Sequence, residues 1–80
     1  MKSFSIIIPV KEINDYLRES VPYLLDLDYE DYEILILPNL EPSNLESIFL
    51  NERVKITASG IVSPAIKRDM GAKQAKFEYL

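Results

Sequence analysis

Two short runs of apolar residues constrain the fold of this 80-residue chain most strongly. One lies within residues 3–9 and has no polar residue after Ser5, and the other occupies residues 32–37. Such largely apolar runs are typical of parallel strands that are covered on both faces. Parallel strands need long connections, so the intervening segments should contain helices that cross from one strand to the next.

The segment after the first run has the features of an amphipathic helix over residues 15–27. Asn14 is a good N-cap, and apolar residues recur at helical spacing beyond it. Pro22 lies inside this segment and has no backbone N–H to donate. We therefore expect a kink or a broken turn at Pro22.

Two further elements are predicted between the second apolar run and the last helix. Ser43 and Glu46 have the spacing of a capping box, which predicts a short helix beginning at residue 43. Residues 54–58 are predicted to form a third strand.

The final helix is predicted to begin after Ser63, with Pro64 at its first position, and to end near Lys76. Residues 78–80 then begin a fourth strand. Alternating strands and helices predict an α/β fold, a parallel Rossmann-like βαβ sheet with flanking helices. We expect residues 1–80 to be one incomplete domain, truncated at its fourth strand.

Composition excludes several classes of function. The chain has no cysteine and no histidine, which excludes zinc sites of the usual kind. The net charge of −4 argues against nucleic-acid binding. The apolar runs are too short to cross a membrane, and the start of the chain does not resemble a signal peptide. We therefore expect a cytoplasmic protein.

Ligands of open parallel sheets bind beyond the carboxyl ends of the strands. Three segments meet this condition: Pro9-Val10-Lys11-Glu12 after the first strand, Pro38-Asn39 after the second, and Ser59-Gly60 before the last helix. We expect Val10, Asn39 and Gly60 to lie together at one rim of the sheet.

The order and spacing of several segments carry a resemblance to a known family. The segments are Pro9-Val10-Lys11-Glu12-Ile13, Glu33-Ile34, Ser63-Pro64-Ala65-Ile66-Lys67-Arg68-Asp69-Met70-Gly71 and Ala75-Lys76-Phe77-Glu78-Tyr79-Leu80. In this order they resemble the start of an inverting glycosyltransferase of family 2, which has the GT-A fold. The chain departs from the family pattern at Pro38 and Asn39, where family members carry paired aspartates.

The resemblance implies a transferase that moves a sugar from a nucleotide-sugar donor to a glycan or lipid acceptor. This chain would supply the nucleotide-binding half of the site. The matching donor-binding positions are Pro9, Val10, Lys11, Glu12, Asn39, Lys67 and Arg68. Asn39 could accept the uracil imide proton through its amide oxygen. Lys67 and Arg68 would lie near the diphosphate, or alternatively on a solvated helix face.

The family also uses Mg²⁺ or Mn²⁺ held by carboxylates, together with a carboxylate base. In family members these groups follow the region that this chain matches, so their ligands are not expected within residues 1–80. We accordingly assign no catalytic residue and no metal ligand, and we expect the 80 residues alone to be inactive as an enzyme.

Two other interpretations remain open at this stage. The chain could be a non-catalytic nucleotide-binding or interaction module, a degenerate remnant of such an enzyme. It could also associate with a second copy through the open edge that an incomplete fourth strand leaves on the sheet.

Overall fold

The computed structural model describes residues 4–27, 31–43, 45–75 and 78–79. Lys76, Phe77 and Leu80, which belong to the motif segments above, lie outside this part of the chain. The elements follow the predicted alternation: β1 (Phe4–Pro9), α1 (Asp15–Leu25), β2 (Tyr32–Leu37), the 3₁₀-helix η1 (Ser47–Phe49), β3 (Val54–Ile56), α2 (Pro64–Gln74) and β4 (Glu78–Tyr79).

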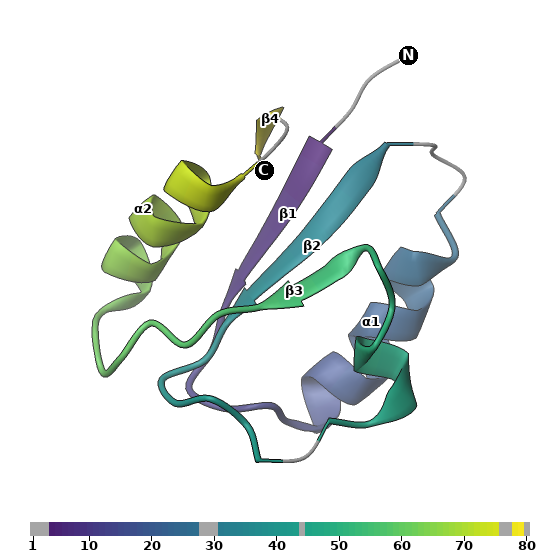
Figure 1. Ribbon diagram of the computed structural model, residues 1–80, viewed down its shortest axis with the longest axis horizontal. Helices are drawn as coiled ribbons and strands as arrows, with labels where there is room; N and C mark the ends of the chain where they lie inside the picture. The colour runs from purple at the N-terminus through teal and green to yellow at the C-terminus, as the bar shows by residue number, and fades with distance from the viewer. Residues whose placement is uncertain (1–3, 28–30, 44, 76–77, 80) are drawn as a thin grey trace.

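All four strands belong to one parallel sheet in the order β3-β2-β1-β4 (Figure 1). The register pairs Ile6 with Ile34, and Ile34 in turn with Val54. The predicted α/β fold with a Rossmann-like parallel sheet is therefore confirmed. The chain moves outward from β1 to β2 and β3, then returns through α2 to the other side of β1. The carboxyl end of β1 is thus the point where the strand order switches.

The main hydrophobic core lies between the sheet and the layer formed by α1 and η1. Helices α1 and α2 stand on opposite sides of the sheet (Figure 1). Side chains alternate between the two faces of a strand, so every second residue of β1 and β2 faces α1. The buried members of this core are Leu17, Val21, Tyr32, Ile34, Ile36, Phe49 and Val54. This core accounts for the apolar residues of β1 and β2 that face α1, and the intervening residues face α2 on the other side of the sheet.

Helix α2 packs on the opposite face through Lys67 and Gly71, its two buried residues. A Cβ atom placed on Gly71 would lie 2.6 Å from Cγ2 of Ile7, so α2 comes very close to β1 at this point. Lys67 precedes Gly71 by four residues and therefore lies on the same face of the helix. The close approach at Gly71 brings Lys67 over the carboxyl ends of the strands.

The same face of the sheet also buries a carboxylate, that of Glu33, near the amino ends of the strands. The Ser5 hydroxyl donates to Oε2 of Glu33 at 2.7 Å, and Nζ of Lys55 lies 3.3 Å from Oε1. Because a buried carboxylate needs such partners, this cluster explains how β2 tolerates one charged residue in an otherwise apolar strand.

The predicted cap of α1 is confirmed, because Oδ1 of Asn14 accepts a hydrogen bond from the Leu17 N–H at 3.0 Å. We expect Asn14→Ala to lower the free energy of unfolding by about 1 kcal/mol, since the first turn of the helix loses this acceptor. Chemical denaturation measures the loss. The control Glu19→Ala alters an exposed position of the same helix and should change stability by less than about 0.5 kcal/mol. Equal losses in both variants would contradict this role of Asn14.

Three elements end earlier than predicted. Helix α1 runs unbroken through Pro22 and ends at Leu25, so the expected broken turn does not occur. Val21, the residue before Pro22, is buried in the core and holds this part of the helix against the sheet. Strand β3 ends at Ile56, and α2 ends at Gln74.

The predicted capping box is wrong. Glu46 itself occupies the N-cap of η1 and makes no capping hydrogen bond with its side chain. Its carboxylate instead binds Arg18 of α1, with 2.5 Å between Oε1 and Nε. A tertiary ion pair has therefore replaced the local contact that the spacing indicated.

Within the described ranges, neither 11-residue helix nor η1 combines the length and the apolar content needed to cross a bilayer.

Candidate functional site

The three loops at the carboxyl edge of the sheet are joined by backbone hydrogen bonds. The Asn39 N–H donates to the carbonyl of Lys11 at 3.0 Å, and the Gly60 N–H donates to the carbonyl of Asn39 at 2.9 Å. Gly60 has a φ of 83°, a left-handed conformation that favours glycine. The loops after β1, β2 and β3 therefore converge on one rim, as the sequence predicts.

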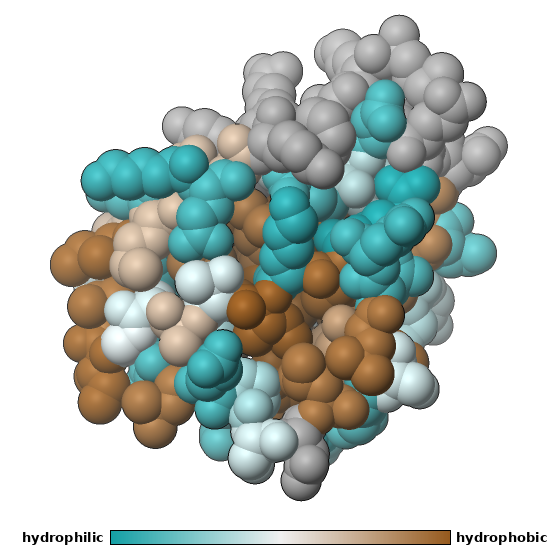
Figure 2. Space-filling model, in the orientation of Figure 1, coloured by the Kyte–Doolittle hydropathy of each residue, from teal (hydrophilic) through white to brown (hydrophobic). Residues whose placement is uncertain are grey.

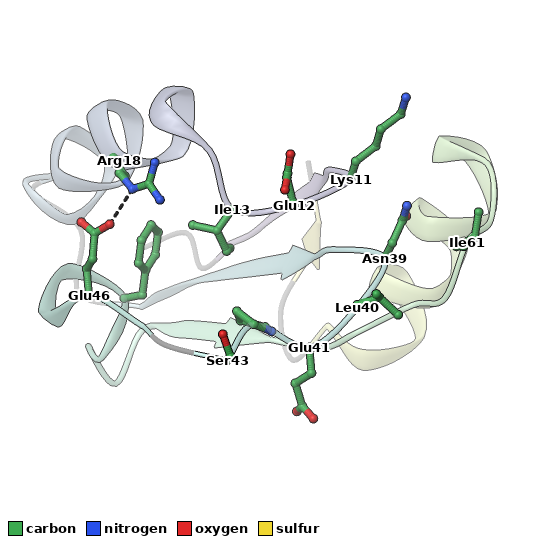
Figure 3. A pocket seen from close by; sticks show the side chains of 12 residues that line it. Lys11, Glu12, Ile13, Arg18, Asn39, Leu40, Glu41, Ser43, Glu46 and Ile61 are labelled. Carbon is green, nitrogen blue, oxygen red and sulfur yellow. Dashed lines mark hydrogen bonds and ion pairs between the residues drawn. The ribbon is translucent and has the colours of Figure 1, made fainter.

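This rim encloses two adjoining hollows of about 500 and about 240 Å³. Lys11, Asn39 and Ile61 line both of them. Figure 3 shows the larger hollow, with Lys11 and Asn39 toward one end and the Arg18–Glu46 pair at the other. The smaller hollow lies directly at the switch point of the sheet.

The predicted site residues divide between the two hollows. Pro9, Val10 and Lys67 line the smaller hollow, and Glu12 lines the larger one. Arg68 lines neither and is exposed on α2. The structure thus brings together every predicted position except Arg68.

Two apolar side chains at this rim were not predicted from the sequence. Ile61 is 84% exposed and Leu40 is 73% exposed, and both line the larger hollow. Figure 2 shows hydrophobic surface over the loop that leads from β3 to α2. Their position in the sequence could have revealed them, because Leu40 directly follows Asn39 and Ile61 directly follows Gly60. Exposed apolar side chains at a hollow offer apolar contact surface to a ligand.

Lys67 is the most unusual residue at the rim, because its side chain is buried although it carries a charge. It is only 3% exposed. Its ammonium nitrogen lies 2.5 Å from the carbonyl oxygen of Val10 and 3.0 Å from that of Leu37. A third contact, of 2.7 Å, joins it to Oδ1 of Asn39. An ammonium group has three N–H donors, so these acceptors use all of them.

Lys67 therefore ties together the ends of β1 and β2 and the loop that follows β2. Burial lowers the pKa of Lys67 from its usual value, because a charged ammonium is less well solvated inside the protein than in water. With its donors occupied, Lys67 has none left for a diphosphate. Its position at the rim was predictable, whereas this structural role was not.

The far end of the larger hollow is acidic. Arg18 binds Glu46 there and also Asp15, with 2.7 Å between Nη1 and Oδ1 of Asp15. These two carboxylates, Glu46 more than Asp15, raise the pKa of Arg18. The carboxylates of Glu12 and Glu41 add further negative charge to the lining.

The resemblance implies a divalent cation at this site. The described residues contain no group of three or more aspartate, glutamate, histidine or cysteine side chains arranged to hold a metal ion. We therefore assign no ligand of Mg²⁺ or Mn²⁺ among the described residues and no chemical step through a metal.

In comparisons with protein-family models, with curated proteins and with solved structures, nothing matches this chain. The class that the structure supports is that of α/β proteins with a hollow at the switch point of a parallel sheet.

Proposed function

We propose that residues 1–80 form the nucleotide-binding part of a glycosyltransferase of the family 2 type. Such a protein would transfer a sugar in the cytoplasm from a nucleotide-sugar donor to a glycan or lipid acceptor. The observation that carries the proposal is the paired hollow at the carboxyl ends of β1 and β2. Rossmann-like sheets bind nucleotides at this kind of position.

The residues of the rim suit a nucleoside. Leu40 and Ile61 offer apolar contact for a base or ribose, and Asn39 offers a polar group between the two hollows. Lys11 is exposed and supplies a positive charge for a phosphate. Glu12 can accept hydrogen bonds from ribose hydroxyl groups.

Titration calorimetry with the free nucleotides UDP and CDP tests the binding part of the proposal. We expect Ile61→Asp to weaken binding by about ten-fold, because the new carboxylate repels the nucleotide and displaces apolar contact. Leu50→Asp is the matched control, since Leu50 is also highly exposed but lies outside both hollows. It should change Kd by less than about two-fold.

Two results would contradict this assignment. If neither nucleotide binds the unmodified chain, the proposed function is wrong. If Ile61→Asp and Leu50→Asp weaken binding equally, the nucleotide binds elsewhere.

Sugar transfer needs a separate test. We expect a fusion with the metal-binding half of a family 2 glycosyltransferase after residue 80 to hydrolyse a nucleotide sugar in the presence of Mn²⁺. Nucleotide binding without hydrolysis in that fusion would instead support the non-catalytic nucleotide-binding module.

A further inference from the structure

The side-chain amide of Asn39 is held in one orientation by Lys67. Nζ of Lys67 lies 2.7 Å from the Asn39 side chain. An ammonium group can only donate, so the amide atom that faces it must be the oxygen and not the nitrogen. Because Nζ also donates to the Val10 and Leu37 carbonyls, it cannot move away from this position without breaking two further hydrogen bonds.

The opposite side of the same amide therefore presents its nitrogen, Nδ2, to the hollows. Figure 3 shows this nitrogen on the side of Asn39 that faces Lys11. In the described part of the chain, Nδ2 has no hydrogen-bond partner, whereas Oδ1 is bound to Lys67. The ligand-facing atom of Asn39 is thus a donor.

This orientation reverses the role that the sequence indicates for Asn39. A uracil ring places an N3–H donor between two carbonyl groups, and its imide proton needs an acceptor from the protein. A cytosine ring instead places two acceptors, N3 and O2, next to each other. A protein donor placed opposite N3 matches cytosine, whereas the same donor opposes the N3–H of uracil and could bind only the carbonyl on either side of it.

We infer that this site selects a cytidine nucleotide over a uridine nucleotide through Nδ2 of Asn39, held by Lys67. The inference rests on the proposed nucleotide-binding function and adds the identity of the base. A mismatched polar pair at a partly buried site weakens binding by about ten-fold, which corresponds to 1.4 kcal/mol.

The experiment compares CDP with UDP by titration calorimetry, using the unmodified chain and Asn39→Asp. Aspartate has the shape of asparagine, so one carboxylate oxygen can keep the contact with Lys67. The other oxygen then replaces Nδ2 and presents an acceptor to the base. The added negative charge repels both diphosphates equally and cancels in the ratio of their dissociation constants.

We expect the unmodified chain to bind CDP about ten-fold more tightly than UDP, and Asn39→Asp to reverse this order. Tighter binding of UDP by the unmodified chain would overturn the inference and leave the proposed function standing. An unchanged ratio in Asn39→Asp would likewise overturn it. Failure of both chains to bind either nucleotide would instead remove the proposed function itself.

Discussion

Replacing Lys67 with methionine will lower the free energy of unfolding by about 3 kcal/mol. The substitution keeps most of the side-chain volume but removes all three hydrogen-bond donors. The carbonyl of Val10 and the amide oxygen of Asn39 then lose their donor at partly buried positions, while the carbonyl of Leu37 loses one donor and keeps the Val10 N–H at 3.3 Å. Such losses form a large fraction of a total stability that is about 5–15 kcal/mol for small domains.

Removing the ammonium group also has an opposing effect, which stabilises the folded protein. Burying an ammonium group costs solvation energy, and methionine avoids that cost. The loss of hydrogen bonds should dominate, because the substitution removes the donor and leaves the three acceptors in place.

Urea denaturation of the two variants Lys67→Met and Arg68→Met measures the effect. Arg68 is the adjacent residue, is exposed, and should change stability by less than about 0.5 kcal/mol when replaced. A Lys67→Met protein as stable as the unmodified chain would show that the solvation cost of the buried ammonium outweighs its hydrogen bonds.

Gly71→Ala is expected to destabilise the chain by up to about 2 kcal/mol, although alanine is the better helix former. Alanine gains about 1 kcal/mol over glycine inside a helix. Here its Cβ would lie 2.6 Å from Cγ2 of Ile7 and 3.3 Å from both Cγ1 and Cδ1. Overpacking of this kind costs about 1–3 kcal/mol. The overpacking should win, because Cγ2 is attached directly to the β-carbon and cannot move without a shift of β1 or an unfavourable rotamer.

A double-mutant cycle with Ile7→Ala tests this explanation. Ile7→Ala removes all three contacting atoms, so Gly71→Ala should become neutral or stabilising in that background. The measurement is again the free energy of unfolding for the four proteins of the cycle. If Gly71→Ala stabilises the chain that retains Ile7, α2 does not approach β1 as closely as the structure indicates.

Much of the architecture was predictable because its signals are local. Asn14 and Ser63 cap helices through contacts with residues three positions away, and both caps occur as predicted. The apolar runs predicted strands buried on both faces, and the rule for parallel sheets then placed the candidate site at the carboxyl ends of the strands.

The capping box failed for the complementary reason. Ser43 and Glu46 have the right spacing for a local contact, but Glu46 binds Arg18, which lies 28 residues away in the sequence. Local spacing could not reveal this partner, because it depends on how η1 is placed beside α1.

Sequence alone determined the alternation of strands and helices and the convergence of the first three loops on one rim, since periodicity, caps and chain order are properties of neighbouring residues. Tertiary structure decided the roles of Lys67 and Arg68, which are adjacent and carry the same charge. The close packing of Gly71 on Ile7 turns Lys67 toward the strand ends and leaves Arg68 in solvent. The direction in which the Asn39 amide faces follows from that contact, because the rotation of a helix about its axis is set by packing between distant residues.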